Sequence, residues 1–122
     1  MIKEACVESF EKALEAQNHG ANRIELCENL AVGGTTPSYG TVKVCLEKLN
    51  IPIFPMIRAR GGNFIYSKDE IEIMKEDIKL ALESLGYANA DVSKWIKDEE
   101  LADINNIGDA IKTILQKIQN KK

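Results

Sequence analysis

The sequence has few of the residues that mark a nucleic-acid partner, a secreted disulfide framework or a membrane span. Its 122 residues include one histidine and three cysteines, and the formal net charge is −3. A weakly acidic chain gives no reason to expect nucleic acid or a membrane surface as partner. No apolar run approaches the roughly 20 residues of a membrane helix, and the N-terminus lacks a signal-peptide core. We therefore expect a cytoplasmic protein whose odd number of cysteines stay free thiols.

The sequence pattern of residues 1–86 predicts three strands, each followed by a helix. The strands are expected at residues 2–7, 23–27 and 51–57, and the helices at about 10–18, 39–49 and 68–86. Ser9 and the Ser67–Glu70 capping box mark helix starts. Short strand–helix connections imply right-handed crossovers and a parallel sheet. The fold class is therefore α/β, either a doubly wound sheet or part of a (β/α) barrel.

Residues 87–122 have a different composition. They contain no proline or cysteine and carry isoleucines three and four positions apart, which is typical of helices that cover an apolar surface. We expect this helical segment to pack on the same domain as residues 1–86. Three parallel strands leave open edges and an apolar face, so the segment or a second copy of the chain should cover them.

Two glycine-rich loops follow the second and third expected strands. The first, residues 29–40, is rich in glycine and hydroxyl side chains, and loops at the carboxyl ends of parallel strands commonly bind ligands. The second contains Arg58, Arg60, Gly61 and Gly62, where arginines precede glycines that let the backbone approach a ligand. This pattern predicts an anion-binding loop.

The cysteines predict either a soft-metal site or inert packing. Strand alternation places Glu4 and Cys6 on the same face of the first strand. It likewise places Glu25 and Cys27 on the same face of the second strand, its neighbour. Two close thiolates select Cu(I), whereas buried cysteines without a partner are usually packing groups. Cys45 lies on the apolar side of a helix and is expected in the core.

The only histidine, His19, lies at the expected end of the first helix, just before Gly20. A histidine there can bind the last carbonyl groups of the helix. We therefore interpret His19 as a cap and not as a metal ligand.

Three motifs together resemble the N-terminal part of the copper homeostasis protein CutC family. They are ACVES, GANRIELCENLAVGGTTPSYG and IFPMIRARGGNFIYSKDEIEIMKEDIKLA, and the similarity covers about residues 2–82. The resemblance implies a cytoplasmic (β/α) TIM barrel of about twice this length, so we expect a partial barrel of about three strands. It also implies a link to copper handling.

Residue by residue, Cys6 and Cys27 match two cysteines of that family that have been proposed to bind Cu(I). The arginines and glycines of the second loop match its arginine–glycine motif, although Ala59 and Asn63 stand where the family usually has proline and aspartate. Residues 97–111 also resemble the last part of acyl carrier proteins, without the motif that carries their prosthetic group.

Three functions remain open at this point. The first is a truncated Cu(I)-binding protein of copper homeostasis. The second is an enzyme, or the remnant of one, that acts on a small anionic molecule with Glu4 and Glu25 as acid and base. For these carboxylates a structural ion-pair network is the alternative. The third is an inactive folded fragment that acts at most in self-association.

Overall fold

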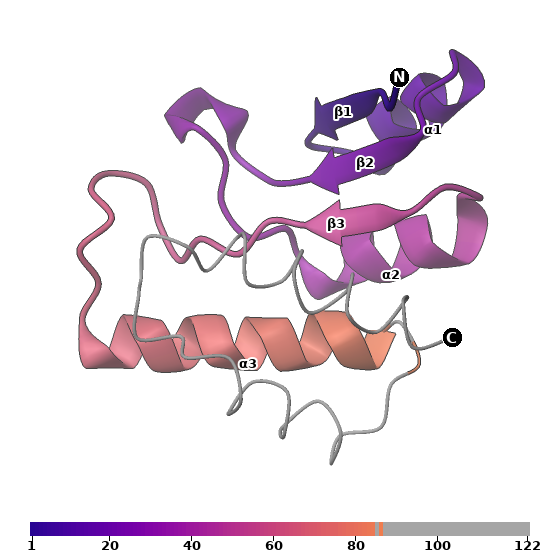
Figure 1. Ribbon diagram of the computed structural model, residues 1–122. Coiled ribbons are helices and arrows are strands. Elements are labelled where there is room, and N and C mark those ends of the chain that lie inside the picture. The colour runs from indigo at the N-terminus through magenta and orange to yellow at the C-terminus, as the bar shows by residue number, and fades with distance from the viewer. Residues whose placement is uncertain (85, 87–122) are drawn as a thin grey trace.

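Figure 1 shows the computed structural model, which describes residues 1–84 and residue 86. Three strands alternate with three helices, and a short 3₁₀ turn lies in the first long loop. The elements are β1 Glu4–Val7, α1 Phe10–Asn18, β2 Arg23–Leu26, η1 Leu30–Val32, α2 Tyr39–Lys48, β3 Ile53–Pro55 and α3 Lys68–Ser84.

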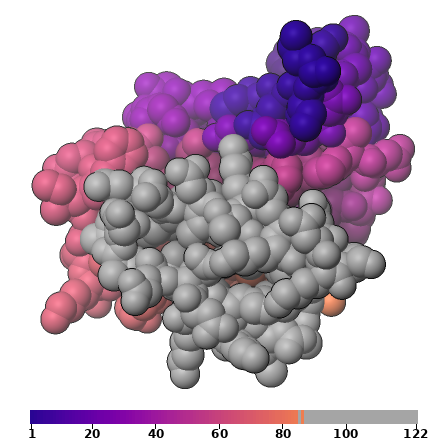
Figure 2. All heavy atoms as spheres, in the orientation of Figure 1, coloured from indigo at the N-terminus to yellow at the C-terminus, as the bar shows by residue number. Residues whose placement is uncertain are grey.

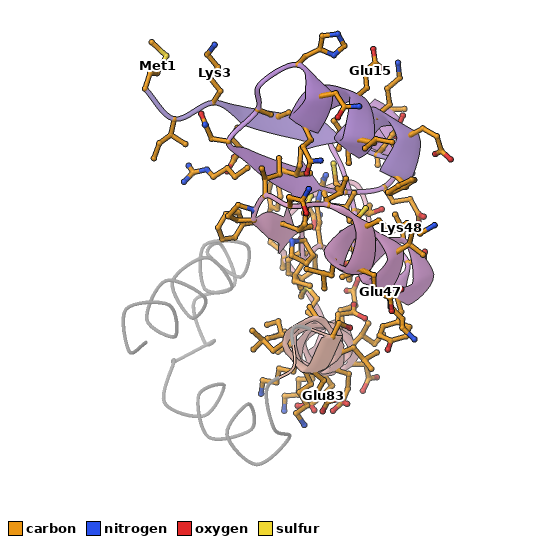
Figure 3. The ribbon with its side chains drawn as sticks, turned by 90° about the vertical axis from the view of Figure 1, so that its right-hand side faces the viewer. Met1, Lys3, Glu15, Glu47, Lys48 and Glu83 are labelled. Atoms are coloured by element: carbon orange, nitrogen blue, oxygen red, sulfur yellow. The ribbon has the colours of Figure 1, made fainter. Side chains whose placement is uncertain are left out.

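The strands form one parallel sheet in the order β1-β2-β3. In the ladder Cys6 pairs with Glu25, and Glu25 pairs with Phe54. The helices α1 and α2 lie on one side of the sheet, and α3 lies beside α2 (Figures 1 and 3). The prediction of an α/β, partial barrel-like unit with a parallel sheet is confirmed in these residues.

The core lies between the sheet and the helices α1 and α2. Alternate residues of β2 and β3 point to this side and are buried together with apolar residues of the helices. The cluster consists of Ala13, Ile24, Leu26, Val42, Cys45, Leu49 and Ile53. Cys45 is therefore a core residue, as its position on the helix predicted.

The helices begin where the sequence predicts. The Ser9 hydroxyl accepts from the Lys12 amide, and the Ser67 hydroxyl accepts from the Glu70 amide at 3.1 Å. At the end of α1, His19 Nδ1 lies 2.7 Å from the Glu15 carbonyl oxygen. His19 is thus a helix cap, as expected from the sequence.

The third strand is shorter than the predicted range 51–57. The strand is Ile53–Pro55. At its two ends the Pro52 carbonyl accepts from the Ile24 amide and the Met56 amide donates to the Leu26 carbonyl. Among the described residues β3 lies at an edge of the sheet, where proline is tolerated.

The predicted helical segment, residues 87–122, lies outside the described residues. Its expected packing over the sheet therefore stays a prediction. The cover of the sheet edges by this segment or by a second copy of the chain stays a prediction. None of the described helices is long and apolar enough to cross a membrane.

The capping box of α3 can be tested by stability measurements. Ser67→Ala should lower the free energy of unfolding by about 0.5–2 kcal/mol, because the Glu70 amide loses its acceptor. Ser84→Ala is the control in the same helix, since Ser84 only bonds back to the Leu80 carbonyl and should change stability much less. Urea unfolding of both variants measures the difference, and equal losses would contradict the capping role.

The capping box formed by Ser67 and Glu70 should also make the free energy of unfolding depend on pH. The backbone amide of Ser67, with a further contribution from Arg60, lowers the pKa of Glu70. A carboxylate whose pKa is lower in the folded than in the unfolded protein stabilises the fold at pH values above its unfolded-state pKa. This stabilisation is lost as the pH falls through the pKa of the folded state. Wild type should therefore lose more stability on acidification below about pH 4.5 than Glu70→Gln does.

Candidate metal site and the loops beside it

Most of the candidate residues gather at the carboxyl ends of the three strands, whereas Glu4 is the first residue of β1 and lies at the opposite end of that strand. Both long loops, residues 27–38 and 56–67, leave the sheet at this end, which is on the left in Figure 1. The second loop and the start of α3 form the pink projection at the side of the molecule in Figure 2. Because parallel strands end together, side chains from β1, β2 and β3 can meet here.

The two loops are joined by backbone bonds. Within the first loop Glu28 and Thr35 exchange amide–carbonyl bonds of 3.0 and 2.7 Å. Between the loops the Thr36 amide donates to the Arg58 carbonyl at 3.0 Å, and the Arg58 amide donates to the Thr36 hydroxyl at 2.8 Å. The first loop is therefore fixed against the second directly beyond the sheet.

The Arg58 guanidinium holds carbonyl groups of both loops. Its Nη1 donates to the carbonyls of Val32 and Gly34 at 2.8 and 3.0 Å, and its Nη2 donates to the Gly62 carbonyl at 3.0 Å. The guanidinium carbon lies 4.9 Å from the centre of the Phe64 ring. Its Nε is buried and has no hydrogen-bond partner among the described residues.

Arg60 holds the second loop to the start of α3. It forms an ion pair with Glu70 and donates to the carbonyls of Asn63 and Ile65 at 3.0 and 2.7 Å. The guanidinium also lies over the Tyr66 ring, 5.1 Å from its centre. All its nitrogens are engaged within the protein.

The glycines of the predicted anion loop likewise have contacts within the chain. A methyl group on Gly61 would come within 3.0 Å of Val32 Cβ, so this glycine lets the first loop pack closely. Gly62 has φ +91° and offers its carbonyl to Arg58. The anion-binding role of these residues stays a prediction, and the observed contacts support an organising role for the loops.

The structure brings the two candidate metal ligands together. Cys6 Sγ and Cys27 Sγ are 3.6 Å apart, and Cys27 Sγ also lies 3.4 Å from the Val7 carbonyl oxygen. Cys27 is 1% exposed, whereas Cys6 is exposed. The two thiols are therefore in contact from neighbouring strands, and their role as metal ligands stays a prediction.

Burial raises the pKa of the Cys27 thiol to about 12, with further contributions from the Cys6 thiol and from the charges of Glu25 and Glu8. A thiolate is poorly stabilised there because it would be buried near negative charge. Cys27 is thus a thiol at neutral pH, and a cation that binds it must displace its proton.

Glu4 and Glu25 lie on the same face of the sheet as Cys6. Glu4 Oε2 is 2.7 Å from Arg23 Nε, and the Arg23 guanidinium lies 5.8 Å from the centre of the Phe54 ring. This is the ion-pair arrangement given above as the alternative to catalysis for Glu4. The acid and base roles of both glutamates stay predictions.

A further residue, Met56, lies beside Cys27 and was not singled out from the sequence. A methyl group on Gly34 would lie 2.9 Å from Met56 Sδ and 3.4 Å from Cys27 Cβ, so both side chains flank the same point. The sequence signal that could have identified Met56 is strand alternation, which places it on the same face as Phe54, two residues before it. In the described residues no group of three or more His, Cys, Asp or Glu side chains could hold a metal ion.

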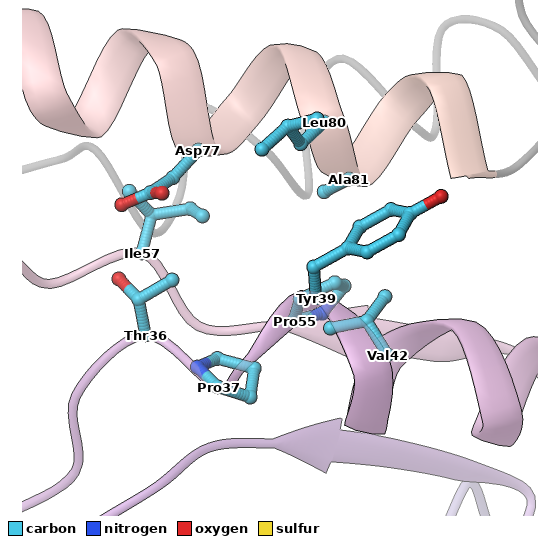
Figure 4. Close-up of a pocket in the computed structure, with 9 residues that line it drawn as sticks. All are labelled: Thr36, Pro37, Tyr39, Val42, Pro55, Ile57, Asp77, Leu80 and Ala81. Carbon is cyan, nitrogen blue, oxygen red and sulfur yellow. The ribbon is translucent and has the colours of Figure 1, made fainter.

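A small notch lies between α2, α3 and the ends of the two loops, where Thr36 and Ile57 line it. Figure 4 shows that Asp77, Leu80 and Ala81 from α3 face Tyr39 and Val42 from α2 across it. Its volume is about 30 Å³, and burial raises the pKa of Asp77 beside it.

The fold and the position of these residues define the class of the protein. Parallel βα units whose strands lie side by side in chain order, β1-β2-β3, are the arrangement of a (β/α) barrel. The chain belongs to the CutC family, whose model it matches over residues 1–115.

Named relatives agree with this assignment. A human copper homeostasis protein cutC homolog is 55% identical over 80 residues, which are 66% of this chain and 29% of the human protein. A CutC family protein of Enterococcus faecalis is 44% identical over 108 residues, which are 83% of this chain and 52% of that protein. The chain thus spans between about a third and a half of the length of these relatives.

A solved CutC structure from Streptococcus agalactiae confirms the fold. It matches with a TM-score of 0.64 and 45% identity over 69% of this chain and 41% of that one. The family match extends past the range 2–82 that the sequence motifs suggested, and it includes residues 97–111, where we noted the similarity to acyl carrier proteins.

The thiols can be distinguished by alkylation. Because burial raises the pKa of Cys27 to about 12, its thiol stays protonated at pH 8, and the thiolate is the reactive form. Iodoacetamide should therefore modify the exposed Cys6 first, as peptide mass spectrometry would show. The Cys6→Ser variant should stay unmodified over the same interval, and all three cysteines should react in denaturant. Labelling of Cys27 as fast as Cys6 would contradict its burial and raised pKa.

Gly34 should be intolerant of a side chain. Its φ is +95°, and the added methyl of Gly34→Ala would press on Met56 Sδ, so we expect a loss of about 1–3 kcal/mol in unfolding free energy. Gly40→Ala is the matched control, because no atom of the described residues lies within 4 Å of the added methyl and Gly40 is helical. The control should gain about 0.5–1 kcal/mol. A neutral result for Gly34→Ala in urea unfolding would show that the loop adjusts freely.

Proposed function

We propose that this protein binds one Cu(I) ion through Cys6 and Cys27 and so takes part in copper homeostasis. The observation that carries the proposal is the 3.6 Å separation of the two sulfur atoms at the carboxyl ends of neighbouring strands. Soft thiolate ligands select Cu(I) over hard cations. The names of the human and bacterial relatives supply the wider role, and the cysteine pair gives it a chemical basis in this chain.

The separation suits a bridging ion with a small adjustment. If the metal–sulfur bond is about 2.3 Å, as for Zn–S, a straight S–metal–S unit needs about 4.6 Å between the sulfurs. The observed 3.6 Å corresponds to a bent unit, or to a linear one after the sulfurs move apart by about 1 Å. Cys6 is exposed and can turn outward, whereas buried Cys27 is fixed.

The electrostatic surroundings favour a cation at this pair. Glu25 and Glu8 contribute negative charge near Cys27, which disfavours a bare thiolate. A Cu(I) ion that replaces the thiol proton keeps a positive charge beside the sulfur, so the deprotonated form becomes acceptable. Free cysteines of this kind persist in a reducing compartment, and we propose the cytoplasm as the place of action.

The enzyme hypothesis has less support. It needs Arg58 and Arg60 as an anion clamp, but Arg60 is fully engaged and Arg58 uses both terminal nitrogens on backbone carbonyls. Glu4, the first candidate acid or base, pairs with Arg23. We therefore do not propose a reaction for this chain.

Cu(I) titration of the full chain under anaerobic conditions tests the proposal. Wild type should compete with a chromophoric Cu(I) chelator and take up one ion per chain. Cys6→Ser and Cys27→Ser should each weaken binding by at least about tenfold, because an oxygen replaces a soft ligand. Cys45→Ala is the control, since Cys45 lies in the core on the other face of the sheet, and it should bind as wild type does.

Circular dichroism should show that the serine variants keep their fold. Unchanged affinity in the double variant Cys6→Ser, Cys27→Ser would overturn the proposal, and so would a wild-type protein that takes up no Cu(I) from the chelator.

A further inference from the structure

Sulfur atoms come from the ends of all three strands, and not only from β1 and β2. Glu25 pairs with Phe54 and Leu26 with Pro55, so Cys27 and Met56 are the next positions of the same parallel register. The Met56 amide continues the ladder by donating to the Leu26 carbonyl at 2.8 Å. Cys27 and Met56 are therefore neighbours across the strand ends.

Alternation places these side chains on the same face as Cys6. Cys6 is the register partner of Glu25, and Glu25 is the partner of Phe54. Cys27 and Met56 each follow one of these residues by two positions, and residues two apart in a strand share a face. All three sulfur side chains thus lie on the face opposite the helix-covered core.

Gly34 provides the space that brings Met56 close to Cys27. A methyl group there would meet Met56 Sδ at 2.9 Å and Cys27 Cβ at 3.4 Å. The absence of a side chain at Gly34 leaves room for the Met56 thioether, which lies against the same backbone position as the Cys27 side chain. Met56 is only half-buried and is not part of the helix-side core, where a methionine would be a simple packing group.

We propose that the thioether of Met56 is the third ligand of the Cu(I) ion held by Cys6 and Cys27. The inference deepens the function proposed above and rests on it. A thioether is a soft and neutral ligand, so it adds affinity for Cu(I) without another proton to displace or another negative charge. The site is then three sulfurs, one from each successive strand end.

The third ligand also gives the site a preference among metals. Two thiolates bind Zn(II) as well as Cu(I), because Zn(II) accepts sulfur, nitrogen and oxygen ligands. A thioether favours Cu(I), which prefers soft ligands. Met56 therefore increases the discrimination of Cu(I) against Zn(II).

Replacement of Met56 by leucine, which conserves volume, separates ligation from packing. Met56→Leu should bind Cu(I) at least about tenfold more weakly than wild type and should discriminate less against Zn(II). Met74→Leu is the matched control, because Met74 is buried in α3 and should leave both affinities unchanged. X-ray absorption of the Cu(I)-loaded full chains should give three sulfur neighbours in wild type and two in Met56→Leu.

A second measurement keeps the test independent of any mutant. The chain has three methionines, so ¹³C-methyl labelling of wild type gives three methyl signals in NMR spectra. One equivalent of Cu(I) should shift the Met56 signal, assigned by its absence from Met56→Leu, and leave the Met74 signal in place.

The outcomes separate the two proposals. If wild type binds one Cu(I) through the cysteines while the Met56 signal and the affinity of Met56→Leu stay unchanged, the third ligand is wrong and the cysteine pair stands. If wild type binds no Cu(I), both proposals fail. Two sulfur neighbours in wild type would also overturn the role of Met56.

Discussion

The contact of the Arg58 guanidinium with backbone carbonyls is the interaction on which the functional end of this molecule depends. One terminal nitrogen holds Val32 and Gly34 in the first loop, and the other holds Gly62 in the second. Charge-assisted bonds of this kind are stronger than neutral ones. Because Gly34 in turn lies against Met56 and Cys27, the arginine fixes the backbone that surrounds the sulfur atoms.

The sulfur site combines a rigid and an adjustable part. Cys27 is buried, donates toward the Val7 carbonyl and cannot easily turn, whereas Cys6 on β1 is exposed. The high pKa of Cys27 means that its thiol keeps its proton at neutral pH. A buried Cys27 thiolate without a cation would be costly, and the protonated thiol leaves no unpaired charge in the protein at this point.

Local features were predictable from the sequence because they depend on neighbouring residues. The caps at Ser9 and Ser67, the core position of Cys45 and the approach of Cys6 to Cys27 follow from hydroxyl positions, helical spacing and strand alternation. The family resemblance added the partial barrel, which the solved relative confirms.

The partners of the arginines could not be predicted in the same way. An Arg-x-Arg-Gly-Gly pattern is compatible both with arginines that bind a ligand anion and with arginines that bind the protein's own carbonyl groups. The position of residues 30–34, whose carbonyls Arg58 binds, decides between these two cases, and the pattern does not contain it. Met56 was missed because the residues of the third strand are apolar on both faces of the sheet. The sequence pattern therefore does not show which of them share a face with Cys27. The position of Met56 beside Cys27 depends on the register between β2 and β3.

For the Cu(I) ion proposed above, the unequal exposure of the two cysteines would set a direction of metal exchange. An ion delivered by another thiol carrier would meet Cys6 first, since Cys27 is closed to solvent. Ligand exchange would then proceed inward, from the edge strand β1 to β2, with the donor's sulfur leaving as Cys27 takes its place. Release would run in the opposite order, so the rotation of one surface side chain would control both the loading and the unloading of the site.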